Sequence, residues 1–115
     1  MGQVLWVVRT TAAAKTDLAK ILRWTSEEFG VGQAQVYLET ITQALEYLSG
    51  GPDIVGSRVR NDIAPHMATL HVSRNGRKGR HFLMFRVRRV DRLNVIEVVR
   101  ILHDSMDLVR HLPPH

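Results

Sequence analysis

The chain has 115 residues, of which 44% are hydrophobic and none is cysteine. This length predicts a single domain, 1–115, whose core removes about two-thirds of the unfolded surface from water. The composition excludes disulfides and thiolate metal sites, and no apolar run approaches the roughly 20 residues of a membrane-spanning helix. Because no signal-peptide pattern occurs either, we expect a soluble cytoplasmic protein that makes no membrane contact.

The net charge of +5 is unevenly distributed along the chain. Ten of the sixteen Lys and Arg residues lie at positions 58–92, where only two acidic residues occur. Positions 1–57 hold four basic and six acidic residues. A basic segment of this kind predicts a surface that faces a negatively charged partner, either a nucleic acid or an acidic protein.

The first predicted elements are one strand and two helices. Residues 4–8 form a short apolar run that favours a strand. Over residues 14–29 apolar side chains recur three or four positions apart, which predicts an amphipathic helix that Thr11 caps and Gly30 ends. Residues 33–48 repeat this periodicity. Because the connection between the two helices is so short, they are expected to form an antiparallel hairpin.

The second half of the chain predicts a loop followed by three strands. Residues 49–66 contain three Gly and two Pro and read as a long irregular segment, which in so small a domain is often functional. Strands are expected at 67–73, 80–87 and 93–103. The dipeptide Asn75-Gly76 between the first two is a hairpin signal. Short turns between consecutive strands predict an antiparallel meander.

The last predicted strand, 93–103, is apolar on both faces, which is typical of a strand covered on both sides. Simple alternation puts Val99 and Ile101 on the same face. It puts the two charged residues, Glu97 and Arg100, on opposite faces. A buried charge needs a partner or access to water, so both are expected near a rim of the sheet.

The predicted order is therefore β-α-α-β-β-β, followed by a C-terminal tail at 104–115. It describes an α+β domain in which the helical hairpin packs on one face of a small antiparallel sheet. The other sheet face is expected to stay partly open. An open face or an open sheet edge predicts a surface that a partner covers.

Few residues fit a pattern of known chemistry. No pair of the six histidines has the i, i+4 helical spacing next to a carboxylate that zinc proteases use, and there is no Gly-rich phosphate loop, so neither metal nor cofactor is expected. His81, His103 and the arginines Arg80 and Arg86 fall on neighbouring strands. A metal-free ribonuclease needs a base, an acid and cations, which these residue types supply. The alternative, a solvated basic surface with two structural histidines, is favoured by base rates.

Short motifs occur in order over residues 13–112: Asp17-Leu18 and Phe29-Gly30, Gln33-Ala34 and Tyr37-Leu38, Asp62-Ile63-Ala64-Pro65, His81-Phe82 and Phe85-Arg86-Val87, Val99-Arg100-Ile101-Leu102-His103, then Met106-Asp107 and His111-Leu112. With these motifs the chain resembles the ParE branch of the RelE/ParE family of toxins from type II toxin–antitoxin systems. The family usually has Tyr where Phe85 stands, so one hydroxyl is missing here.

The resemblance implies the same β-α-α-β-β-β fold and a toxin that a ParD-like antitoxin neutralises in a hetero-oligomer. It also implies that the protein inhibits DNA gyrase and so blocks replication, without being an enzyme. Operator DNA would be met only indirectly, through the antitoxin.

The alternative is the RelE branch, which contains ribosome-dependent messenger RNA endonucleases. For that activity the candidate catalytic residues are His81, Arg86 and His103. Both tyrosines, Tyr37 and Tyr47, fall on the second helix, so no Tyr follows the last strand, as it often does in these nucleases. This departure weakens the nuclease interpretation.

Two groups of residues are candidates for contacts with partners. For the antitoxin we expect the exposed parts of the hairpin and sheet, with Trp24, Phe29, Tyr37, Tyr47 and Arg86. For the cellular target we expect the end of the last strand and the tail, with Arg100, His103, Met106 and Arg110. The alternative is that Phe29, Tyr37 and Tyr47 belong to the core and that Met106 only anchors the tail.

Overall fold

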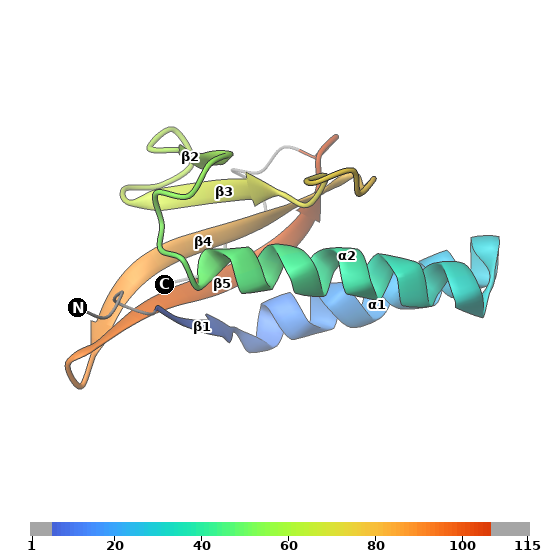
Figure 1. Ribbon diagram of the computed structural model, residues 1–115, viewed down its shortest axis with the longest axis horizontal. Coiled ribbons are helices and arrows are strands. Elements are labelled where there is room, and N and C mark those ends of the chain that lie inside the picture. The colour runs from blue at the N-terminus through green and yellow to red at the C-terminus, as the bar shows by residue number, and fades with distance from the viewer. Residues whose placement is uncertain (1–5, 107–115) are drawn as a thin grey trace.

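The computed structural model describes residues 6–106 and packs two antiparallel helices against one face of a five-stranded sheet (Figure 1). The elements are β1 (Val7–Thr10), α1 (Ala12–Phe29), α2 (Val31–Leu48), β2 (Ser57–Val59), β3 (Met67–His71), β4 (His81–Val90) and β5 (Leu93–His103). The predicted α+β architecture and the helical hairpin are confirmed. Neither helix combines the length and apolar character that crossing a membrane would require, within the described part of the chain.

The sheet has the strand order β1-β5-β4-β3-β2. The three predicted strands of the meander are present and antiparallel, and a short β2 from the segment 49–66 extends them at the edge. The first strand instead pairs in parallel with the last one, with Val7 opposite Val95. The sheet is therefore mixed rather than wholly antiparallel, and its first strand occupies positions 7–10 rather than 4–8, of which 4 and 5 lie outside the described residues.

The helical hairpin begins at Thr11 and turns at Gly30. The Thr11 hydroxyl oxygen accepts a hydrogen bond from the Ala14 N–H at 3.1 Å, which is the predicted N-cap. The same hydroxyl donates to the Val99 carbonyl at 2.8 Å and so fixes the start of α1 to β5. Gly30 has a φ of 94° and is the only residue between the two helices, so α2 begins two residues earlier than predicted, at Val31.

Two clusters of buried side chains lie on the two sides of the sheet. The larger one, between the hairpin and the sheet, contains Ala14, Ile41, Ala44, Leu48, Ala68, Leu70, Val72, Leu83, Phe85, Ile96, Val98 and Ile101. The smaller one, on the opposite face, contains Ile63, Met67, Met84, Val99 and Leu102. Because Ile63 belongs to the segment that precedes β3, that segment covers part of the face expected to be open.

A β-bulge interrupts β5 opposite the step from Met84 to Phe85 in β4. The extra residue shifts the alternation of side chains between the two faces by one position. Ile101 therefore points into the core under the hairpin, while Val99 points to the opposite cluster. The prediction that Val99 and Ile101 share a face is therefore wrong. Because of this shift, His103 also faces the hairpin, where the candidate site lies.

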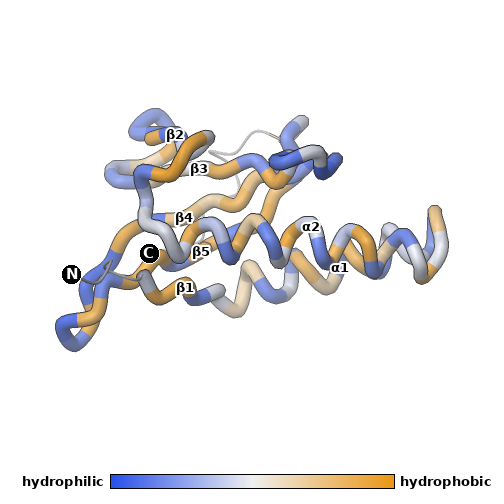
Figure 2. The backbone as a smooth tube through the Cα atoms, viewed as in Figure 1, coloured by the Kyte–Doolittle hydropathy of each residue, from blue (hydrophilic) through white to orange (hydrophobic). Residues whose placement is uncertain are grey.

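Each of the two connections between the strands of the meander contains a tight turn. The predicted hairpin at Asn75-Gly76 is confirmed, since both residues have positive φ, of 49° and 79°. The β4–β5 turn uses Asp91 and Arg92, also at positive φ, of 50° and 68°. This second turn ends a ribbon that continues beyond the rest of the sheet, and Figure 2 shows its end as strongly hydrophilic.

Candidate functional site

The candidate site is centred on two histidines at the adjoining ends of β4 and β5. His81 begins β4 and lies directly opposite His103, the last residue of β5. Their ring centroids are 5.2 Å apart, with the ring planes at 83°. The expectation that these two histidines are neighbours is confirmed.

Tyr37 of α2 connects this pair to the hairpin. Its hydroxyl oxygen lies 2.5 Å from Nδ1 of His81 and accepts a hydrogen bond from the Arg80 backbone N–H at 3.1 Å. The direction of the hydrogen bond between the Tyr37 hydroxyl and Nδ1 depends on the tautomer of the His81 ring. Burial raises the pKa of the Tyr37 hydroxyl, which therefore stays protonated.

His81 is neutral in this environment. Burial is the largest cause that lowers its pKa from 6.5 to about 4. The other histidine is held by Ser105, whose backbone N–H donates to Nδ1 of His103 at 3.1 Å. The pair is thus fixed by hydrogen bonds on both of its outer sides.

Asp104 holds the polar rim of the site together. It accepts hydrogen bonds from Nε2 of His71 at 3.0 Å and from Nε of Arg80 at 3.2 Å. The hydrogen bond from His71 is the main cause that lowers the pKa of this carboxyl, and Arg80 lowers it further. The Asp104 N–H also donates to the Arg80 carbonyl at 2.7 Å, which ties the chain after β5 to the start of β4.

A hollow of about 410 Å³ opens beside the histidine pair, and we call it the aromatic hollow. Its lining is mostly apolar, with cationic side chains at the rim, and consists of Trp24, Thr25, Phe29, Gln33, Tyr37, Lys78, Gly79, Arg80, His81 and His103. It is open to solvent along the hairpin. Such a surface can accept an apolar side chain of another protein while its rim attracts acidic groups.

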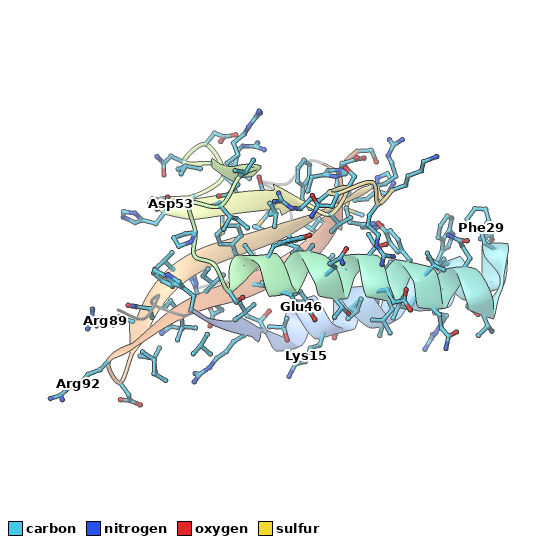
Figure 3. All side chains as sticks on the ribbon, viewed as in Figure 1. Lys15, Phe29, Glu46, Asp53, Arg89 and Arg92 are labelled. Carbon is cyan, nitrogen blue, oxygen red and sulfur yellow. The ribbon has the colours of Figure 1, made fainter. Side chains whose placement is uncertain are left out.

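Trp24 and Phe29 form the outer wall of the aromatic hollow. Their rings meet edge to face at a centroid distance of 5.7 Å, and their exposed fractions are 57% and 65%. Figure 3 places Phe29 at the tip of the hairpin, past the ends of the strands. Both were predicted as antitoxin contacts, and both are exposed. The helical periodicity had also placed Phe29 on the buried face of α1, but in the structure Thr25 is the last buried residue of that helix.

The other predicted antitoxin contacts lie in different places. Tyr37 is half-buried in the wall of the aromatic hollow. Tyr47 lies at the far end of α2, where Asn75 donates to its hydroxyl and Arg74 stacks over its ring at 5.0 Å. These two tyrosines are therefore separate, and only Tyr37 belongs to the hollow.

Arg86 lies on the opposite face of the sheet. Its cross-strand neighbours are Met67, which belongs to the opposite cluster, and Glu97, to which it donates from Nε at 2.9 Å. The expectation that Arg86 joins His81 and His103 in one constellation is therefore wrong, because five strand positions and the thickness of the sheet separate it from them.

The residues predicted to contact the target gather around the end of β5. Arg100, His103 and Met106 line a second hollow of about 230 Å³, which we call the β5 hollow. Met106 is 44% exposed, and its N–H donates to the His103 carbonyl at 3.0 Å. Arg110 lies outside the described residues.

Sequence reasoning missed Asp17 and Gly79 as residues that shape the site. Asp17 of α1 accepts from Nε and Nη2 of Arg100, at 2.7 and 2.9 Å, and the hydrogen bond to Asp17 raises the pKa of that guanidinium. Asp17 and Arg100 each occur in one of the family motifs, but they are 83 positions apart, so their pairing left no local signal in the sequence. A Cβ on Gly79 would lie 3.0 Å from the Tyr37 ring, so Gly79 leaves room for that ring.

Metal binding was not expected from the sequence. Among residues 6–106, no three His, Asp or Glu side chains are placed to share a metal ion. What the site offers is a neutral histidine, a set of cationic side chains at the rim and a large apolar wall. These groups suit recognition of a protein surface.

Comparison with known proteins gives a consistent result over most of the chain. The sequence model described as the ParE toxin of type II toxin–antitoxin systems, parDE, matches residues 8–108. Two proteins called Toxin ParE1, from two strains of Mycobacterium tuberculosis, are each 33% identical over 100 residues. The match covers 87% of this chain and 91% of each relative.

Two solved structures share the fold. A chain from the structure titled "Chromosomal ParDE TA system from P. aeruginosa" has a TM-score of 0.70 at 20% identity, covering 89% of this chain and 98% of that one. A chain titled "YoeB/ParE toxin from Agrobacterium tumefaciens" has a TM-score of 0.54 at 13% identity, covering 84% and 96%.

Proposed function

Because the chain belongs to the ParE toxin family and is the toxin component of a toxin–antitoxin system, we propose that a ParD-like antitoxin neutralises it and that its target is DNA gyrase. In this proposal the toxin binds gyrase, stops replication and performs no chemistry itself. It acts in the bacterial cytoplasm, and sequence-specific binding to operator DNA is left to the antitoxin.

The observation that carries the antitoxin proposal is the exposed aromatic pair at the aromatic hollow. Trp24 and Phe29 leave a large apolar surface in contact with water, beside a hollow lined by residues of both helices. Exposed patches of this kind mark protein–protein contacts. An amphipathic antitoxin helix that places its apolar face over Trp24 would bury them, which is a common mode of peptide recognition.

Charge supports the same partner. Lys78 and Arg80 line the aromatic hollow, and Lys20 lines the hollow on the other side of Trp24. An acidic antitoxin segment would be attracted to this rim and would bind faster at low salt. The apolar wall would then supply the affinity and the rim the orientation.

For the target contact we propose the β5 hollow. It brings Arg100, His103 and Met106 together on a surface distinct from the outer wall at Phe29. Toxin inhibition by binding alone is supported by the character of the site, because a large exposed apolar wall beside cationic side chains suits recognition of a protein surface. A bound antitoxin that covers Trp24 and His103 would block this surface at the same time.

A supercoiling assay with purified components tests the proposal. Gyrase, relaxed plasmid and the toxin are combined with and without the cognate antitoxin. We expect loss of supercoiling, or accumulation of cleaved plasmid, and recovery when antitoxin is added first. Normal supercoiling at a large molar excess of toxin would refute gyrase as the target.

One observation favours a second candidate, the ribosome-dependent messenger RNA endonuclease. His81 and His103 are close enough to act as general base and general acid on the same phosphodiester, and Arg80 adds a cation beside them. The test is cleavage of messenger RNA on translating ribosomes by the wild type and by His81→Gln and His103→Gln. If the wild type cleaves messenger RNA and each substitution abolishes that cleavage, the endonuclease activity would replace gyrase inhibition as the proposed function.

A further inference from the structure

The β4–β5 hairpin carries four arginines on a ribbon that leaves the body of the protein. We call residues 86–94 the arginine ribbon. Pairing of β4 with β3 ends at Arg86, and pairing of β5 with β1 begins at Val95. Val87 and Arg88 therefore pair only with β5, and residues 89–94 pair only with one another. Figure 3 shows Arg89 and Arg92 directed away from the body at this end.

The arginines lie on both faces and at the tip of the ribbon. Arg88 and Arg89 are consecutive in β4, so their side chains point to opposite faces. Arg92 occupies the turn, beside Asp91. On one face Glu97 accepts from Arg86 at 2.7 Å and from Arg88 at 3.2 Å, which neutralises part of the charge there and fixes the two guanidinium groups. The ribbon as a whole remains cationic.

We propose that the arginine ribbon is a duplex-DNA contact that reads the phosphate backbone from within the major groove. Two strands about 4.8 Å apart form a ribbon narrow enough for the major groove of B-DNA, which is about 12 Å wide. A groove presents phosphates on two walls, and a ribbon with Arg88 on one face and Arg89 on the other can reach both.

The composition of the ribbon favours duplex DNA over other polyanions. Residues 86–94 contain no aromatic side chain on which unpaired bases could stack, as single-stranded nucleic acids require. The major groove of A-form RNA is too narrow to admit it. An acidic protein surface would meet one face only and leave the arginines of the other face in solvent.

This contact goes beyond the proposed function. It supplies affinity without sequence preference, because phosphate contacts carry no direct base information. It therefore differs from operator recognition, which belongs to the antitoxin. A toxin that binds duplex DNA by itself would be concentrated along the chromosome, whatever its enzyme target.

The test is fluorescence anisotropy of a labelled mixed-sequence DNA duplex about two helical turns long, titrated with antitoxin-free toxin. Salt is varied between about 50 and 200 mM, since binding to phosphates weakens by a log–log slope of about −0.9 per contact. We expect the variant Arg89→Gln/Arg92→Gln to reduce that slope by about 2 and to weaken binding at least about tenfold at the lowest salt.

A matched variant, Lys15→Gln/Arg23→Gln, removes the same charge from exposed positions of α1. It is expected to change the affinity by less than about twofold, and thermal melts of both variants should match the wild type. Equal weakening by the two variants, or no salt-dependent binding of the wild type, would overturn the proposal. So would displacement of the DNA by an RNA duplex or by poly-glutamate at lower concentration than by unlabelled DNA. None of these results depends on the supercoiling assay, so the two proposals can fail separately.

Discussion

Asp17 on α1 and Arg100 on β5 form a bidentate ion pair across the interface between hairpin and sheet, with N–O distances of 2.7 and 2.9 Å. The same carboxylate accepts the Ile101 backbone N–H at 2.9 Å. Only 10% of the Asp17 side chain and 22% of the Arg100 side chain are exposed. Arg100, a predicted target contact, therefore also holds the first helix to the last strand.

Removing either partner of this pair is expected to destabilise the fold. Asp17→Ala and Arg100→Ala should each lower the free energy of unfolding by about 3 kcal/mol, because each leaves a largely buried charge without its partner. Urea unfolding measures the change, and the double variant should lose clearly less than the sum. As a control, Arg60→Ala breaks the exposed pair with Asp62 and should cost under about 1 kcal/mol.

The same variants separate folding from target binding. If Arg100 acts only on stability, Arg100→Ala and Asp17→Ala will reduce toxicity equally in growth assays. If Arg100 also touches the target, Arg100→Ala will lose more than Asp17→Ala at matched soluble expression.

Trp24 and Phe29 are predicted to contribute to antitoxin affinity but little to stability. Trp24→Ala and Phe29→Ala should each weaken antitoxin binding by about 2 kcal/mol, measured by calorimetry, because buried aromatic anchors dominate such interfaces. The free energy of unfolding should change by less than about 0.5 kcal/mol, since both side chains are exposed. The control Val55→Ala removes an apolar side chain that is 87% exposed in the segment between α2 and β2, outside the aromatic hollow. An equal affinity loss in this control would place the interface elsewhere.

The buried neutral histidine predicts a pH dependence of stability. The pKa of His81 is about 4 in the folded protein and near 6.5 when unfolded, so between these values the unfolded chain binds more protons. The contribution of His81 is fully present above pH 6.5 and is lost as the pH falls towards about 4. In unfolding titrations at several pH values, His81→Gln should lose less stability than the wild type over this window.

A second histidine serves as the control for that titration. His66 is exposed and has a φ of 63°, a conformation that asparagine tolerates. His66→Asn therefore removes an exposed imidazole without straining the backbone, and it shows what the loss of a histidine alone does to the pH profile. A His81→Gln profile parallel to that of the wild type would show that His81 titrates normally.

Gly79 is predicted to be necessary for the position of the Tyr37 ring. A Cβ at this residue would lie 2.5 Å from Cγ2 of Val72 and 3.0 Å from the Tyr37 hydroxyl, so Gly79→Ala should destabilise the fold by about 1–3 kcal/mol. Gly32→Ala is the matched control. It has open space around its Cβ in α2 and should be neutral or stabilising by up to about 1 kcal/mol. Equal stability of the two variants would contradict the contact.

The helices were predictable because their apolar periodicity is local. The exception is the tip, where Phe29 continues the apolar stripe of α1 but projects past the ends of the strands (Figure 3). Periodicity identifies a helix face but does not say where the surface beneath it ends. A helix longer than the sheet it covers therefore exposes residues that look like core, and here those residues form the candidate interface.

Long-range pairing was less predictable. The neighbours His81 and His103 followed from a meander with short turns, whereas the parallel pairing of Val7 with Val95 has no signal in either segment. The bulge in β5 inserts one residue into a strand that is largely apolar on both faces, so alternation could not locate it at Val99. β2 has only three residues, too few to show a period.

The parallel pairing of β1 with β5 has a consequence for how the chain folds. The first strand meets its partner 88 positions later, whereas α1 and α2 are neighbours in sequence and can associate at once. Contacts of such long range slow folding, because the loop must close before they form. During synthesis the apolar face of the hairpin, with Ala14 and Ile41, is therefore not fully covered until the last strand has been made. The toxin can thus become active only after nearly all of its chain exists, which gives a partner or a chaperone time to capture it beforehand.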